Sequence, residues 1–478
     1  MKRRLPPTFA IIAAASLLAI PAAEAEATSP RGRPLGLAQP FMATSDVAMI
    51  RMPAVDVAAY RAEDVTLAQS GRVVPFRFAA PIKTSITPAR DGSWETLPNG
   101  WLLWRLRIVS PGALNLNLWL DRFNLPAGAA LWLYDGSGAV VQGPYTSSDR
   151  NALGELWTPA VLGDELVVEL DLPPGAEGDS DLRIASVNHG YRIFGDDPTA
   201  THTEQGSCNI DVICPEGDDW RDQIRSVARL IILGTYLCTG QLLNTTAQDE
   251  TPYMLTAQHC VEDAYQATTV IAFWNYESPA CGMLSGGISD DHQIGATLVS
   301  SWQWLTGSDF SLILLDEMPD PSFNVYYSGW DATGDAPLGS VGIHHPSGDE
   351  KALALNDDLL LATNHYGHGS HQWEVSEWEQ GTTEGGSSGS CLYDPASRLC
   401  VGTLTAGTAS CTNPSGYDIY GRMDAHWTGE GTPTSRLSDW LDPHGIGDLT
   451  LSGRDSDSTI FFDGFETGNT SRWSASSP

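Results

Sequence analysis

The chain has 478 residues, of which 42% are hydrophobic and 16 are tryptophan, enough apolar material for two or three globular units. Its formal net charge of −33 at pH 7 excludes nucleic acid as a partner, because phosphate groups would be repelled. Residues 203–447 alone hold 33 Asp and Glu against 7 Lys and Arg, which either keeps the surface solvated or attracts basic ligands.

The N-terminus has the three parts of an export signal. Met1-Lys2-Arg3-Arg4 is basic, residues 9–20 are apolar, and Ala23-Glu24-Ala25 offers a cleavage site. The apolar run is too short to span a bilayer comfortably, and no later run of about 18 uncharged apolar residues exists. A retained anchor is the alternative. We expect residues 1–25 to be a signal peptide, and the protein to be secreted without a membrane segment.

Residues 26–202 contain no cysteine and have the pattern of a β-rich unit. Apolar runs separated by turn residues predict strands at residues 101–109, 114–120, 130–134 and 166–170. Regular short strands of this kind are typical of a small sandwich. Because no group of catalytic residue types occurs here, we expect this unit to inhibit the unit that follows or to assist its folding. A carbohydrate-binding module is the alternative.

Residues 203–447 form a second unit, after a linker at residues 195–202. Its Val, Ile, Leu and Thr runs alternate with Gly and Pro turns, which predicts an all-β fold with one short helix near residues 435–441. All eight cysteines lie beyond residue 200, and their even number in an exported chain indicates disulfides. We expect no metal, because no C-x-x-C pair with matching His spacing occurs. Residues 448–478 are a C-terminal extension.

Three residues in this unit have the types and order of a nucleophilic triad. His259 lies in Thr-Ala-Gln-His-Cys, Asp309 precedes the apolar run 310–315, and Ser388 lies in Gly-Ser-Ser-Gly-Ser. A serine hydroxyl needs an imidazole to take its proton and a carboxylate to orient that imidazole. The order His, Asp, Ser is that of the chymotrypsin arrangement. The alternatives are a core histidine beside a disulfide and a turn aspartate.

The loop around Ser388 also predicts an oxyanion site. Gly386 lets the backbone turn, so that its N–H and that of Ser388 point at one spot. The same loop fits G-x-S-x-G in another register, which would make Ser387 the nucleophile of an esterase, but that motif requires a strand-turn-helix context absent here. His344-His345-Pro346 offers a metal candidate or, as we favour, a structural turn.

At these residues the chain from about 206 to 445 resembles the bacterial lysyl endopeptidases, a secreted branch of the chymotrypsin-like serine proteases. The matching segments are 206–212, 214–218, 237–240, 274–276, 308–310, 343–346, the Ser388 loop, 418–422 and 435–443. The resemblance implies a double β-barrel with the active site between the barrels. It also implies a signal peptide, an inhibitory propeptide at residues 26–202 and a removable C-terminal extension.

The resemblance further implies the disulfides Cys208–Cys411, Cys214–Cys281 and Cys238–Cys260. Cys391 and Cys400, which the family pattern lacks, flank a turn, so a hairpin staple between them is our hypothesis.

Substrate preference follows from the same resemblance. Asp418 implies a pocket for the ammonium group of a substrate lysine, and the pocket floor offers the neutral Thr382 and Thr383. Three positions depart from the family pattern: Thr405 replaces a His, Tyr366 or His365 replaces a Trp, and Ala406 replaces a Gly. We therefore expect cleavage after Lys, with Arg tolerated.

These observations predict a secreted bacterial serine endopeptidase that acts through an acyl-enzyme. Its partners would be protein or peptide substrates and its own propeptide as an intramolecular inhibitor. We expect a monomer without cofactor, metal, nucleic acid or membrane. Ser387 stands where trypsin-like zymogens have an Asp, so latency must come from the propeptide. The alternatives are a non-catalytic binding protein on a protease fold and a protease with non-basic specificity.

Overall fold

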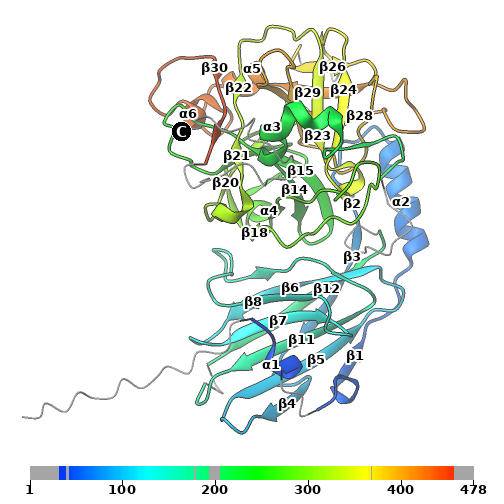
Figure 1. Ribbon diagram of the computed structural model, residues 1–478, viewed down its shortest axis with the longest axis vertical. Helices are drawn as coiled ribbons and strands as arrows, with labels where there is room; N and C mark the ends of the chain where they lie inside the picture. The colour runs from blue at the N-terminus through cyan, green and yellow to red at the C-terminus, as the bar shows by residue number, and fades with distance from the viewer. Residues whose placement is uncertain are drawn as a thin grey trace, which may run out of the picture.

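The computed structural model describes residues 32–456 except 39–41, 177–178, 193–204, 366 and 368. The predicted signal peptide and residues 457–478 of the predicted extension therefore lie outside the described residues, as do the linker at 195–202 and Tyr366. The described chain forms two units, one above the other in Figure 1. We call them the N-terminal unit (residues 32–192) and the C-terminal unit (residues 205–456).

The N-terminal unit is a β-sandwich of two mainly antiparallel sheets. One sheet has the order β1-β5-β11-β7-β8, with β4 paired to β5, and the other has the order β10-β6-β12-β3, with β9 paired to β6. The strands of the first sheet are β1 (Met49–Arg51), β4 (Ser93–Thr96), β5 (Leu102–Val109), β7 (Ala130–Asp135), β8 (Val141–Tyr145) and β11 (Glu165–Leu172). Those of the second are β3 (Ala79–Ile86), β6 (Asn115–Asn124), β9 (Leu156–Trp157), β10 (Val161–Leu162) and β12 (Asp181–Gly190).

Alternate residues of these strands fill the sandwich interior. Trp104, Leu106 and Ile108 of β5 pack with the leucines of β6, β7 and β11 in one buried cluster. Since side chains of a strand alternate between faces, this period of two is what the apolar runs predicted. The predicted sandwich and its four strands are confirmed.

The C-terminal unit is a double β-barrel, as predicted. Its first sheet has the order β18-β17-β14-β15-β16-β20-β19. Its second sheet has the order β13-β24-β23-β27-β28-β29-β26-β25; in addition, β22 pairs with β28, and β30 pairs with β22. The first sheet comprises β14 (Val227–Ile232), β15 (Tyr236–Leu242), β16 (Tyr253–Thr256), β17 (Ile271–Phe273), β18 (His292–Ile294), β19 (Ala296–Trp302) and β20 (Phe310–Leu315). The second comprises β13 (Ile210–Asp211), β22 (Trp330–Asp331), β23 (Ser340–His344), β24 (Ala352–Asn356), β25 (Leu361–Thr363), β26 (Gln372–Val375), β27 (Cys391–Tyr393), β28 (Cys400–Gly407), β29 (Asp418–Arg422) and β30 (Thr450–Leu451). A two-stranded sheet pairs β21 (Tyr326–Tyr327) with β31 (Arg454–Asp455).

The helices are short, apart from one. They are α1 (Leu35–Ala38), α2 (Val57–Gln69), α3 (Arg221–Ser226), α4 (Ala264–Thr268), α5 (Met423–Thr428) and α6 (Ser438–Leu441). The helix predicted near 435–441 is present as α6. Within the described ranges, no helix has the length and apolar character needed to cross a membrane.

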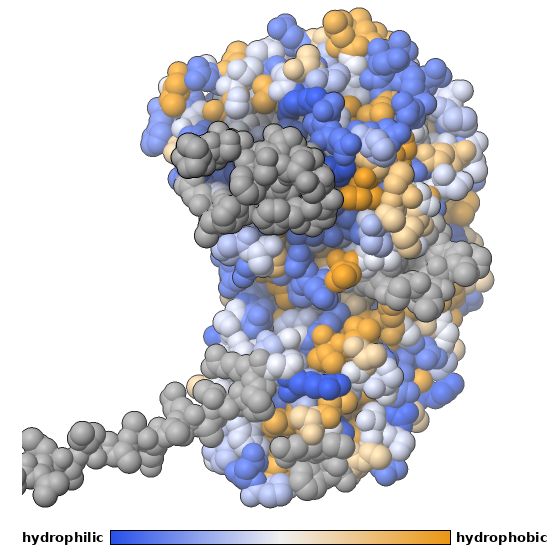
Figure 2. Space-filling model, in the orientation of Figure 1, coloured by the Kyte–Doolittle hydropathy of each residue, from blue (hydrophilic) through white to orange (hydrophobic). Residues whose placement is uncertain are grey.

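Helix α2 and the strand after it belong to the N-terminal unit in sequence but lie beside the C-terminal unit (Figure 1). That strand, β2 (Phe76–Arg77), pairs antiparallel with β15 of the first barrel sheet. A buried apolar cluster also joins the units: Phe78 and Trp157 of the sandwich pack with Ile231 and Leu237 of the barrel. The outer surface is largely hydrophilic on the face seen in Figure 2, with hydrophobic residues scattered over both units.

The four disulfides join the predicted cysteine pairs: Cys208–Cys411, Cys214–Cys281, Cys238–Cys260 and Cys391–Cys400. No cysteine is free. The hypothesis of a hairpin staple is thereby confirmed, because Cys391 and Cys400 stand on the paired strands β27 and β28.

Candidate active site

His259 and Asp309 meet because their strands are neighbours. His259 follows β16 and Asp309 precedes β20, and these two strands pair antiparallel. Asp309 has a φ of 61° and accepts two hydrogen bonds from His259, at 2.8 Å from Nδ1 to Oδ2 and 3.1 Å from the backbone N to Oδ1. Both side chains are only 1% exposed. A carboxylate that accepts from Nδ1–H holds the imidazole in the tautomer whose Nε2 can take a proton.

Ser388 lies in a loop that both barrels hold in place. The N–H of Thr239, on β15, donates to the Ser388 carbonyl at 2.8 Å, and the Thr239 hydroxyl donates to the Gly386 carbonyl at 2.9 Å. The N–H of Gly389 donates to the carbonyl of Leu404 on β28 at 2.8 Å. Ser388 and His259 line the same cavity. The His259 Nε2 atom is buried and has no hydrogen-bond partner among the described residues, so it can still accept a proton.

Gly386 is required by the shape of this loop. Its φ is +95°, and a Cβ there would stand 2.6 Å from the backbone N of Gly348. Since a side chain fits neither the conformation nor the space, only glycine is compatible. Gly386 and Ser388 both line the cavity, as the predicted oxyanion site needs.

Ser387 points away from the cavity into the second barrel. Its buried hydroxyl is 2.9 Å from His344 Nδ1 and accepts from the N–H of Glu384 at 3.2 Å. Burial lowers the pKa of His344 to about 3, so the imidazole is neutral. A fully buried Ser387 cannot attack a substrate, which excludes the esterase register. His344 ends β23 and thus supports the residue before Ser388.

Asp418, at the start of β29, is a fully buried carboxylate in the cavity wall. Its Oδ2 accepts from Trp378 Nε1 and from the Thr383 hydroxyl, each at 2.7 Å. Its Oδ1 has no partner within the described chain. Burial raises the pKa of Asp418 to about 6, an effect that the hydrogen bonds from Thr383 and Trp378 and the nearby backbone N–H of Ala409 oppose. One oxygen is therefore fixed and the other remains able to bind a cation.

Of the other three predicted pocket residues, two line the cavity and one does not. Thr383 and Thr405 line the cavity, and the Thr405 hydroxyl is buried with no partner among the described residues. Thr382 is not among the cavity's lining residues, and its hydroxyl is 3.4 Å from the Thr383 carbonyl.

Trp378 was not predicted as a site residue. It precedes Ser388 by ten positions and reaches Asp418 only because β26 and β29 pair. The family resemblance placed an aromatic residue before Trp378, but nothing in the sequence connected Trp378 itself with Asp418.

The cavity also contains part of the N-terminal unit. Its volume is about 650 Å³, and its lining includes the segment 72–77 together with His259, Ser388 and Asp418. A Cβ on Gly385 would stand 2.4 Å from Phe76 Cδ2, so the Phe76 ring lies directly on the loop that carries Ser388. The N-terminal unit thus enters the candidate active site.

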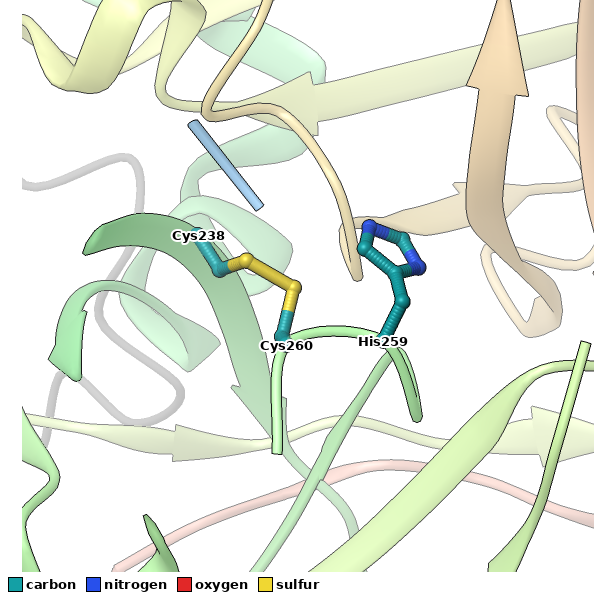
Figure 3. Close-up of side chains that lie close together, drawn as sticks. All are labelled: Cys238, His259 and Cys260. Atoms are coloured by element: carbon teal, nitrogen blue, oxygen red, sulfur yellow. A yellow bond between two sulfur atoms is a disulfide. The ribbon is translucent and has the colours of Figure 1, made fainter. Parts of the chain in front are cut away.

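His259 also stands next to two sulfur atoms. The ligand atoms of Cys238, His259 and Cys260 lie within 4.8 Å of one another (Figure 3). Both sulfurs are joined in the Cys238–Cys260 disulfide, so neither is a thiolate that could bind a metal. The disulfide instead ties the His259 loop to β15.

Comparison with known proteins gives similarity over both units. Residues 202–421 match the family model of the lysyl endopeptidase C-terminal domain, and residues 44–191 match that of the lysyl endopeptidase N-terminal domain. Over 379 residues the chain is 30% identical to a lysyl endopeptidase of Pseudomonas aeruginosa, covering 71% of this chain and 77% of that protein.

Solved structures share less with the chain. An HtrA-type protease, AlgW, with a tripeptide is 15% identical with a TM-score of 0.31, covering 44% of this chain and 60% of that chain. A Glu endopeptidase in complex with MPD is 17% identical with a TM-score of 0.28, covering 42% of this chain and 85% of that chain.

Proposed function

Because this chain belongs to the lysyl endopeptidase family and is a serine endopeptidase, we propose that it cleaves peptide bonds after basic residues, with Lys preferred and Arg tolerated. The observation that supports this preference is Asp418, a buried carboxylate with one unpartnered oxygen in the cavity that Ser388 and His259 line.

The proposed reaction begins with attack by Ser388 on the carbonyl carbon of the scissile bond. His259 Nε2 takes the serine proton and then gives it to the leaving amine, while Asp309 stabilises the imidazolium and keeps it oriented. The oxyanion binds to the N–H groups of Gly386 and Ser388, and each such donor contributes a factor of about 10²–10³ in rate. Water then hydrolyses the acyl-enzyme by the same steps in reverse order.

The preference for a basic residue follows from the cost of an unpaired charge. When a lysine ammonium enters the cavity, it pairs with Asp418 Oδ1, while Trp378 and Thr383 hold Oδ2. An uncharged side chain would leave the buried carboxylate without a counter-ion, which costs about 3–5 kcal/mol when one partner of a buried pair is missing. That difference corresponds to a discrimination of about 10²–10⁴.

The N-terminal unit is proposed as a propeptide that inhibits the enzyme until it is removed. Its segment 72–77 lines the cavity, and the buried cluster of Phe78, Trp157, Ile231 and Leu237 holds the two units together. The proposed mature enzyme is a secreted monomer, which the four disulfides suit.

One experiment tests the catalytic assignment and the preference together. The mature enzyme and its Ser388→Ala variant are treated with a fluorophosphonate and then given a peptide library. We expect labelling of the wild type alone and cleavage after Lys, with slower cleavage after Arg. Labelling that persists in Ser388→Ala would refute the nucleophile, and cleavage without a basic preference would refute the role of Asp418.

A further inference from the structure

The segment 72–77 enters the cavity as a continuation of the first barrel sheet. Phe76 stands opposite Leu237 and Arg77 opposite Tyr236 in an antiparallel pair, and the N–H of Phe78 donates to the Thr235 carbonyl at 2.9 Å. Residues 76–77 thus add a short strand to the part of β15 that β16 leaves unpaired, which is the way extended peptides dock on exposed strand edges.

The register of this pairing assigns Val74 to the position beside Ser388, and both residues line the cavity. Because the pairing is antiparallel and Leu237 stands opposite Phe76, Cys238 corresponds to Pro75 and Thr239 corresponds to Val74. The N–H of Thr239 is already taken by the Ser388 carbonyl. The segment therefore leaves β15 where it reaches the nucleophile loop, and it does so at Val74.

The direction of the carbonyl groups agrees with this register. In an extended strand, alternate residues turn their N–H and C=O groups to the same side. Because the Phe78 N–H faces the barrel, the carbonyls of Phe76 and Val74 face it as well. Extended by two residues, this alternation directs the Val74 carbonyl toward the loop of Gly386 and Ser388, which line the same cavity as Val74. The register therefore assigns the Val74–Pro75 bond to the position beside Ser388.

This bond is a poor substrate in two respects. Val74 has no positive charge, so Asp418 would stay unpaired while the bond is attacked. Pro75 supplies the leaving nitrogen, and its ring fixes φ and occupies the position of the amide hydrogen. The loss of that N–H costs the sheet nothing, because at residue 75 it would point away from β15.

A charged cluster at the other end keeps the segment in place. The Arg77 guanidinium donates to Asp64 Oδ1 at 2.7 Å and to Glu63 at 2.9 Å, both on α2. Asp64 Oδ2 also accepts from the Tyr191 hydroxyl at 2.8 Å and from Arg192 at 3.0 Å. The Arg192 guanidinium lies 4.5 Å from the Phe76 ring centroid. Helix α2 and the end of the sandwich thereby clamp the segment onto β15.

We propose that residues 72–77 are a substrate-directed inhibitory strap, which presents the Val74–Pro75 bond to Ser388 and escapes cleavage because valine and proline flank that bond. This rests on the proposed function, because the strap occupies the site that would bind a basic substrate. In this proposal the strap binds to the edge of β15 and to the Ser388 loop.

The test converts the strap into a substrate within the full-length chain. The variant Val74→Lys/Pro75→Ala carries a preferred residue and a cleavable bond in the proposed register. We expect loss of the intact chain and a new fragment that begins at residue 75, identified by mass and N-terminal sequencing. The same variant with Ser388→Ala must stay intact, which assigns the cut to this active site.

Two variants control for register and for proline. Val73→Lys/Pro75→Ala has the same composition one residue out of register and should not be cut after residue 73. Val74→Lys alone keeps the proline and should remain uncut after residue 74. Cleavage of Val73→Lys/Pro75→Ala after residue 73 would overturn the proposed register. Cleavage of Val74→Lys after residue 74 would overturn the proposed role of Pro75.

The proposed function is assayed in parallel, so the two ideas fail separately. The mature wild-type enzyme is given a lysyl peptide. No cleavage of that peptide would refute the proposed function. Cleavage of the peptide, with the Val74→Lys/Pro75→Ala chain left intact, would refute the strap. Should that chain not be secreted, the Val74→Arg/Pro75→Ala variant provides the same readout with the tolerated residue.

Discussion

A single ionisable residue, Asp418, couples substrate preference to pH. Burial raises its pKa to about 6, so the carboxylate that would bind a lysine ammonium is lost as pH falls through that value. We expect the ratio of kcat/KM for a Lys substrate to that for a norleucine substrate to fall as pH is lowered from 8 to 5. The ratio is the useful measurement, because any effect of pH on the chemical step shared by the two substrates cancels in it.

Substitutions at Asp418 and Trp378 separate the charge from its support. Asp418→Asn should lower the ratio by about 10²–10⁴ and make it independent of pH. Trp378→Phe removes one donor to Oδ2, a hydrogen bond to a charged group worth about 1.5–3 kcal/mol. The pKa of Asp418 should therefore rise, and on lowering the pH the ratio should begin to decrease at a higher pH than in the wild type. A pH-dependent ratio in Asp418→Asn would contradict this assignment.

At the scale of elements, the hairpin of β27 and β28 supports the nucleophile loop from behind. Its strands pair beside the Cys391–Cys400 disulfide, and Leu404 on β28 exchanges hydrogen bonds with the loop at Gly389 and Ser390. Closing a loop of this length stabilises a protein by about 2–3 kcal/mol through the entropy of the unfolded chain. We expect Cys391→Ala/Cys400→Ala to lower the Tm of the mature enzyme.

The activity of that variant shows whether the disulfide only stabilises the fold or also contributes to catalysis. Well below its Tm, the kcat should stay near that of the wild type, because the backbone hydrogen bonds of Leu404 remain. An unchanged Tm, or loss of activity in a folded variant, would show that the disulfide has another role.

Elements with a strong apolar period were predictable from the sequence, whereas segments stabilised by distant partners were not. The runs at residues 101–109 and 310–315 became β5 and β20, because a short run of consecutive apolar residues is typical of a strand that is buried on both faces. Helix α2 has no buried residue, so it carries no apolar pattern to detect. Segment 72–77 is likewise defined by its contacts with β15, which only the tertiary structure provides.

The candidate site shows the same division. His259, Asp309 and Ser388 were recognisable because each has a short local context and a fixed order. The contacts of Trp378 with Asp418 and of His344 with Ser387 join residues 40 and 43 positions apart. Such pairs depend on which strands become neighbours, and a single sequence does not state that.

At the scale of the whole molecule, the N-terminal unit contains a pair of buried carboxyl groups that makes its stability depend on pH. Glu169 and Asp171 are alternate residues of β11 on the same face, and burial raises the pKa of both. Glu169 accepts from the Gly36 N–H and the Tyr134 hydroxyl, each at 2.7 Å, and Asp171 accepts from Trp132 Nε1 at 2.9 Å. Arg105, whose charge also acts on Glu169, forms its ion pair with Glu95.

The sign of the effect follows from proton binding in the two states. In the unfolded chain these carboxyls ionise near pH 4, whereas the folded unit retains protons above that pH because their pKa values are raised. The folded state then binds more protons than the unfolded state, so its free energy of unfolding falls as pH rises above about 4, by about 1.4 kcal/mol per pH unit for each retained proton. An alkaline medium should therefore loosen the proposed inhibitor.

The full-length Ser388→Ala chain allows this to be measured without self-digestion. We expect the Tm of its N-terminal unit to decrease from pH 5 to pH 9, and Asp171→Asn to flatten that decrease, because an amide can still accept from Trp132 but cannot ionise. Asp181→Asn is the matched control, since Asp181 is an exposed strand aspartate paired with Arg122 and 57% accessible. A Tm that rises with pH, or equal slopes in both variants, would show that the buried pair does not determine how the stability of the N-terminal unit depends on pH.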